Sequence, residues 1–173
     1  MIELERTYLV KSIPEGLKDC KSKEVIDIYV PLSAFHPVLR IRKNGDNYEI
    51  TKKQPVKGDD SSEMEEQTIV LTKEEFENLS EVRGKYLRKI RYYYNYHGRT
   101  AEVDVFQDKL KGLILVDFEF DNPEDKNNFQ KPDFCLEDVT QERLTAGGML
   151  CGKSYEDIEK DLEKFGYKKL IMD

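Results

Sequence analysis

Alternation of apolar and charged residues is the feature of this sequence that most restricts its fold. Successive side chains of a strand point to opposite faces, so a period of two predicts strands with one apolar and one ionic face. Short Gly-containing links, "KNGDN" at 43–47 and "YHGRT" at 96–100, predict hairpins and therefore antiparallel neighbours. The predicted strands are residues 1–10, 24–31, 37–45, 47–55, 62–71, 86–98, 99–108 and 110–121.

Two amphipathic segments are predicted as helices between these strands and after them. The first begins at Thr72 as its N-cap and stops at Gly84. The second begins at Ser154 and ends just before Gly166. A further helical turn is expected to begin at Pro123. The helices and a run of tyrosines at 92–96 provide apolar cover for the outside of a closed sheet.

Closure of eight antiparallel strands turns their ionic faces inward. An eight-stranded barrel has room inside for side chains and one small ligand. We therefore expect an α+β, mainly β fold: an eight-stranded antiparallel closed barrel (a tunnel) with amphipathic helices packed outside. A single domain is predicted over 1–173, with the barrel at about 1–121 and a helical tail at about 122–173 that plugs one mouth. The expected inward charges are Glu3, Glu5, Glu63, Glu65, Glu102, Asp104, Asp117, Glu119, Arg40, Arg42, Lys53, Lys89 and Arg91.

Charges of both signs inside a barrel must pair or bind something, because unpaired buried charges cost several kcal/mol each. A metal-bound polyphosphate needs both signs, since carboxylates hold hard divalent cations while Arg and Lys bind phosphate oxygens. The alternative is an open sheet whose charges are solvated, as in a β-rich interaction protein.

Composition excludes several other classes of function. The net charge of −7 argues against non-specific binding to nucleic acid. No apolar run reaches the roughly 18 residues of a membrane span, so no membrane partner and a cytoplasmic location are expected. Three cysteines without CxxC spacing fit reduced thiols. His36 and His97 lie at turns and do not suggest a nucleophilic triad.

The ordered motifs resemble the CYTH, or triphosphate tunnel metalloenzyme, superfamily from residue 3 to about residue 140. "ELERT" resembles its N-terminal ExExK strand, and "VLRIRKNGDNYEITKKQP" its paired-arginine hairpin. "EMEE", "KIR", "EVDVF" and "LVDFEF" are similar to its later acidic and basic pairs. The resemblance implies hydrolysis of a triphosphate in a tunnel that requires Mg²⁺ or Mn²⁺.

Carried over residue by residue, the resemblance implies specific roles. The implied metal ligands are Glu3, Glu5, Glu63, Glu65, Asp104, Asp117 and Glu119. The implied phosphate-binding residues are Arg40, Arg42, Lys53, Lys89 and Arg91. Tyr29, together with Glu3 and Glu5, is the implied catalytic group that orients or activates water.

Thr7 stands where the family has a lysine, and Ser61 lies near the position of a family arginine. We expect the loss of two cations to slow, alter or abolish turnover. A triphosphatase acting on inorganic tripolyphosphate or a nucleoside triphosphate is the first hypothesis. A non-catalytic module that binds polyphosphate or nucleotide, and an activity like that of class IV adenylyl cyclases, are the alternatives, and a homodimer is left open.

Overall fold

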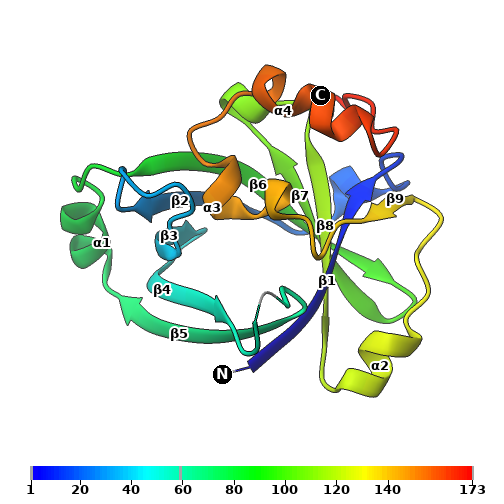
Figure 1. Ribbon diagram of the computed structural model, residues 1–173, viewed down its shortest axis with the longest axis horizontal. Coiled ribbons are helices and arrows are strands. Elements are labelled where there is room, and N and C mark those ends of the chain that lie inside the picture. The colour runs from blue at the N-terminus through cyan, green and yellow to red at the C-terminus, as the bar shows by residue number, and fades with distance from the viewer. Residues whose placement is uncertain (1, 59, 173) are drawn as a thin grey trace.

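Eight strands form a closed antiparallel barrel in the computed structural model, which describes residues 2–58 and 60–172 (Figure 1). The strands are β1 (Ile2–Val10), β2 (Ser22–Val30), β3 (Leu39–Asn44), β4 (Asn47–Pro55), β5 (Glu63–Leu71), β6 (Lys85–Tyr96), β7 (Arg99–Phe106) and β8 (Ile114–Phe120). Their order is β5-β4-β3-β2-β6-β7-β8-β1. A short β1–β5 ladder closes the ring and pairs residues 2–4 with residues 63–65. The predicted closed barrel is confirmed.

A short ninth strand, β9 (Cys135–Asp138), extends the sheet beside the far end of β1. It pairs with residues 8–10, which β5 does not reach. The sequence reading did not include β9, because four residues are too few to establish a period of two.

Four helices accompany the strands: α1 (Lys73–Leu79), α2 (Pro123–Asn128), α3 (Gly147–Leu150) and α4 (Tyr155–Glu163). Single 3-10 turns cover Leu17–Asp19, Asp108–Leu110 and Arg143–Thr145. The expected N-caps are present, since Thr72 and Ser154 each form a capping box with the residue three positions on. No helix within the described ranges is long and apolar enough to cross a bilayer.

Gly84 does not end helix α1, which stops at Leu79. A Cβ at Gly84 would lie 2.6 Å from Ile28 Cγ2 and 2.8 Å from the Tyr29 carbonyl oxygen. The glycine therefore lets the chain approach β2 closely as it enters β6, which is a packing requirement that helix-end signals do not distinguish.

The outward faces of β1, β6, β7 and β8 form one of two apolar cores. Phe118 on β8 packs against Phe129, with ring centroids 4.7 Å apart, and against Tyr8 at 6.0 Å. Tyr94 and Tyr96 also pack against this cluster. Tyr92, Tyr94 and Tyr96 therefore cover the outside of the barrel, whereas Tyr93 pairs in register with Glu102 and has the opposite phase.

The second core fills one end of the barrel itself. Along several strands the inward face changes from charged to apolar, and the apolar inward residues there are Leu9, Tyr29, Leu87, Phe106 and Leu115. Ile158 and Leu162 of α4, together with Leu150 of α3, pack onto these residues. α4 thus packs outside the strands and covers one end of the barrel, in agreement with the predicted amphipathic helices outside the barrel. In the view of Figure 1, α3 (orange) overlaps the ring of strands.

We predict that truncating Ile158, which is fully buried, destabilises the protein far more than truncating Ile171, which is 46% exposed. Ile158→Ala should cost about 2–5 kcal/mol of unfolding free energy, because it removes packing from the closed end. Ile171→Ala should cost less than about 0.5 kcal/mol. Urea unfolding measures both, and slow amide exchange across residues 145–166 is expected in the wild type. Equal losses in the two variants would contradict this role of α4.

Candidate functional site

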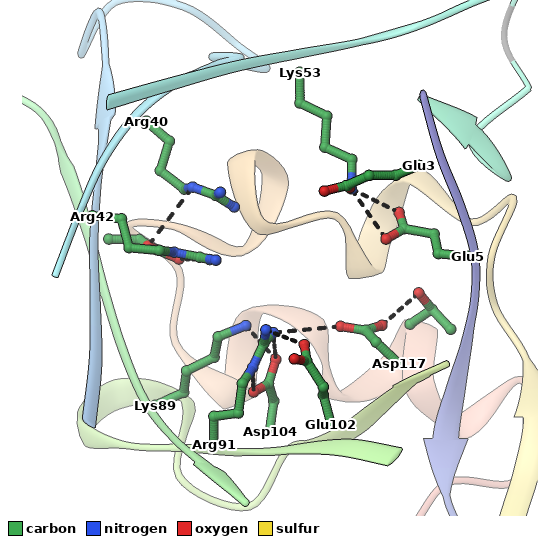
Figure 2. A network of polar contacts seen from close by, with 12 residues as sticks. Glu3, Glu5, Arg40, Arg42, Lys53, Lys89, Arg91, Glu102, Asp104 and Asp117 are labelled. Atoms are coloured by element: carbon green, nitrogen blue, oxygen red, sulfur yellow. Dashed lines mark hydrogen bonds and ion pairs between the residues drawn. The ribbon is translucent and has the colours of Figure 1, made fainter. Parts of the chain in front are cut away.

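A cavity of about 510 Å³ occupies the barrel between its charged inward faces. Ten carboxylates and six lysine or arginine side chains line it, so the lining carries a formal excess of four negative charges. The charges are not mixed evenly. Cations predominate on β3 and β6, while most carboxylates come from β1, β7 and β8 (Figure 2). The cavity is therefore polarised from one wall to the other.

Asp27 on β2 organises the cationic wall. It pairs in register with Arg42 on the neighbouring strand β3. Arg42 donates two hydrogen bonds to it, from Nε to Oδ1 at 2.6 Å and from Nη2 to Oδ2 at 2.8 Å. Burial alone would raise the pKa of Asp27, but the Arg42 guanidinium outweighs burial and holds that pKa at about 2. Arg42 is thus fixed in one orientation by an ionised partner.

Arg40, two residues earlier on β3, is less completely paired. Its Nε is buried and has no hydrogen-bond partner among the described residues. A carboxylate oxygen of Asp27 lies 3.9 Å from its Nε, and one of Glu49 lies 3.6 Å from its Nη2. Figure 2 shows the guanidinium reaching into the barrel interior. A buried donor of this kind is normally satisfied, so Arg40 is ready to bind an anion.

Lys89 and Arg91 on β6 extend the cationic wall and share Asp104 on β7 as a partner. Arg91 donates to Asp104 Oδ1 at 2.7 Å and to Oδ2 at 2.8 Å. Lys89 also donates to Asp104, and Arg91 to Glu102. Burial lowers the pKa of Lys89 although Asp104 opposes the shift. Asp104 therefore pairs with two cations at once and is itself buried.

The acidic wall is built on β1 and the strands beside it. Glu5 lies opposite Glu119 in the β1–β8 ladder, and Thr7 lies opposite Asp117. Thr7 donates its hydroxyl hydrogen to Asp117 Oδ1 at 2.7 Å. Lys53 from β4 enters this wall and contacts both Glu3 and Glu5.

Burial, together with the crowding of like charges, raises the pKa values of two carboxylates of the acidic wall. Burial raises the pKa of Glu5, and Asp117 and Glu3 raise it further, while Lys53 opposes them. Burial also raises the pKa of Glu119, with contributions from Glu102, Glu3 and Glu5. These carboxylates would gain from an added cation.

The donors of the acidic wall fit a hard divalent metal. Carboxylate oxygens are the ligands that Mg²⁺ and Mn²⁺ prefer. Within residues 2–58 and 60–172, no three acidic, histidine or cysteine side chains are already grouped closely enough to hold a metal ion alone. Mg²⁺ commonly uses one or two carboxylates and completes its shell with water and substrate phosphate, so the wall fits that mode of binding.

The structure does not place Glu63 and Glu65 in the cavity, which corrects the prediction that they face inward. Directly paired residues share a face of a sheet, and Glu65 pairs with Gln54, whereas Lys53 pairs with Glu66. β5 therefore turns Met64 and Glu66 inward. Glu63 lies 3.4 Å from the Lys126 ammonium, outside the set of residues that line the cavity. This strand supplies one inward carboxylate where two were expected.

Tyr29 and Thr7 lie on opposite sides of the cavity. Each lines the cavity, but β2 is four strands away from β1 in both directions around the ring, so they lie on opposite walls. Tyr29 pairs in register with Arg40, and a Cβ on Gly147 would lie 2.1 Å from the Tyr29 hydroxyl oxygen. Burial raises the pKa of this tyrosine. Its hydroxyl is covered by the tail.

The remaining predicted residues, Glu3, Glu5, Arg40, Arg42, Lys53, Lys89, Arg91, Glu102, Asp104, Asp117 and Glu119, all line the cavity. The sequence reading missed Asp27, Glu49 and Glu66, which line it as well. Glu49 has the same phase as Lys53 on its strand, so the alternation contained the signal for it. Residues 145–148 also line the cavity, as a plug formed by the tail requires.

Comparison with known proteins agrees with this geometry. An inorganic triphosphatase of Nitrosomonas europaea is 28% identical over 145 residues, which cover 83% of this chain and 92% of that relative. The crystal structure of an inorganic triphosphatase superposes with a TM-score of 0.61 at 26% identity, covering 86% of this chain and 93% of that one.

A candidate adenylate cyclase from Bacillus halodurans superposes with a TM-score of 0.52 at 16% identity, over 99% of this chain and 93% of that one, and shows the shared fold alone. The model of the CYTH domain matches residues 1–121, which span all eight strands of the barrel. The chain therefore belongs to the CYTH domain family.

Proposed function

We propose that this protein hydrolyses a triphosphate, either inorganic tripolyphosphate or a nucleoside triphosphate, in a reaction that depends on Mg²⁺ or Mn²⁺. The observation that carries the proposal is the polarised cavity, with Arg40, Arg42, Lys89 and Arg91 facing the carboxylates of the opposite wall. The similarity to an inorganic triphosphatase supports the same reaction class.

The chemistry of phosphoryl transfer suits this lining, because it requires mainly positioning and neutralisation of charge. Arg40 would bind a phosphate through its unpartnered Nε, and Arg42, fixed by Asp27, would present its remaining donors. Glu3, Glu5, Asp117 and Glu119 would hold the metal. A bound divalent metal would supply charge neutralisation and polarisation of the phosphate oxygens.

Two roles in the proposal follow from where the side chains lie. Tyr29 lies beside Arg40 with its hydroxyl against Gly147 of the tail, and it would contact a phosphate oxygen or its water only if the tail moves away from that hydroxyl. Glu3 and Glu5 belong to the metal end, where they would help to orient the attacking water. Asp104 would act through Lys89 and Arg91, because its oxygens are already occupied by them.

Binding without turnover is the second candidate function. The observation that favours it is the pair of uncharged residues Thr7 and Ser61, which line the cavity at positions where the resemblance to the family implies cations. Melting shifts produced by tripolyphosphate with metal, in the absence of phosphate release, would select this candidate over hydrolysis.

We predict that Arg40→Ala lowers kcat/KM for tripolyphosphate about tenfold to a hundredfold, because a charge-assisted contact is worth roughly 1.5–3 kcal/mol. Release of phosphate in the presence of Mg²⁺ or Mn²⁺ measures the change. Arg88→Ala is the matched control, since Arg88 lies on the outer face of β6 and is bound to Asp108. An equal loss of activity in both variants would mean that the cavity is not the site of reaction.

We also predict that Thr7→Lys raises kcat/KM by about tenfold, because it adds a cation able to make one more charge-assisted phosphate contact. Thr7→Met is the control, as it fills similar space without charge. The two variants are compared in the same phosphate-release assay. If the lysine variant is no faster than the methionine variant, Thr7 does not limit turnover.

A further inference from the structure

The Lys53 ammonium occupies the point where the carboxylates of Glu3 and Glu5 converge. Its Nζ lies 2.7 Å from Glu3 Oε2, and 3.0 Å and 3.1 Å from the two oxygens of Glu5 (Figure 2). Three oxygens of two glutamates thus surround one positive charge. The ammonium of Lys53 therefore occupies the position at which Glu3 and Glu5 could bind another cation.

This contact is well shielded from solvent. The Lys53 and Glu3 side chains are each 24% exposed, and that of Glu5 is 21% exposed. Glu66, which pairs in register with Lys53, also lines the cavity beside it. Electrostatic attraction is stronger at such a site than on an open surface, so the ammonium is held firmly in the absence of other cations.

A divalent metal and this ammonium exclude one another at the two glutamates. Mg²⁺ binds carboxylate oxygens at about 2.0–2.1 Å. A metal at Glu3 and Glu5 would therefore lie within a few ångströms of Nζ, and the two positive charges would repel strongly. Lys53 must leave the glutamates before they can hold a metal.

The fold gives the displaced ammonium a place to go. Thr51, two residues before Lys53 on β4, pairs with Arg40 on β3, so Lys53 is the diagonal neighbour of Arg40. Such neighbours are about 7–8 Å apart, which long side chains can span. The flexible stem of lysine carries a compact charge, so the ammonium can move from the carboxylates to a phosphate held by Arg40.

We propose that Lys53 is an internal counter-cation that competes with the divalent metal for Glu3 and Glu5 and transfers to the triphosphate when the metal binds. The proposal rests on the proposed function in that a metal and a phosphate chain share the cavity. The proposal makes metal and triphosphate binding cooperative. The metal releases the ammonium for the triphosphate, and the triphosphate draws the ammonium away from the two glutamates that bind the metal. Such coupling is reciprocal, so triphosphate tightens metal binding by the same factor.

Calorimetric titration of Mn²⁺ into metal-free protein, without any phosphate compound, tests the competition. Lys53→Met should bind Mn²⁺ about tenfold more tightly than the wild type. Lys52→Met is the matched control, because Lys52 is exposed on the opposite face of the same strand, and it should bind Mn²⁺ as the wild type does. Equal or weaker binding by Lys53→Met would overturn the proposal.

Displacement can also be followed in the wild-type protein, which avoids any loss of stability in Lys53→Met. Lysine labelled with ¹³C at Cε gives one signal per residue, and Lys53→Arg identifies the signal of Lys53. Saturating Mg²⁺ should shift that signal and leave that of Lys52 unchanged. A Lys53 signal that stays fixed at saturation would overturn the proposal. Neither experiment measures hydrolysis. A negative result here would overturn the competition but not the proposed hydrolysis, and an absence of phosphate release would overturn the hydrolysis but not the competition.

Discussion

Mutual neutralisation of charges inside the barrel is the constraint on which the rest of the structure depends. A buried ion costs several kcal/mol unless partners replace its water. Asp27 and Asp104, which are 1% and 2% exposed, offset this cost on the cationic wall by pairing with Arg42, Lys89 and Arg91. Because these two acids are committed to pairing, the unbalanced negative charge lies on the acidic wall.

The change from charged to apolar residues along the inward faces of the strands sets where the charged cavity ends inside the barrel. On β1, Glu5 and Thr7 are followed by Leu9, and on β7, Asp104 is followed by Phe106. The apolar ends attract α3 and α4, so the same burial that stabilises the fold also closes one end of the cavity. The contacts of α3 and α4 with the apolar ends of the strands therefore both stabilise the fold and limit the cavity.

The sequence predicted the barrel well because period-two alternation and turn chemistry are local signals. It predicted the inward faces of most strands for the same reason. It failed at "EMEE", where both phases of the strand contain a glutamate, so only the pairing of Lys53 with Glu66 decides which residues face inward.

The failure at Asp27 has another physical cause. Asp27 stands between isoleucines, and the strand reads as an apolar run, because both of its faces are largely covered. Which residues face one another across the cavity, such as Tyr29 and Thr7, follows from the order of strands around the ring, a global property that no local pattern contains.

Polarity across the cavity restricts what kind of ligand can use both walls. β1 and β3 are three strands apart around the ring, and neighbouring strands are about 4.8 Å apart, so the backbones that carry Arg40 and Glu5 are separated by more than the width of one phosphate, although Arg91 of β6 lies 3.6 Å from Asp117 of β8. A single phosphate would satisfy Arg40 and Arg42 and leave the acidic wall unchanged. A chain of phosphates that carries a cation can reach from the guanidinium groups to the carboxylates. The geometry therefore favours a linear polyphosphate over a compact anion of the same charge.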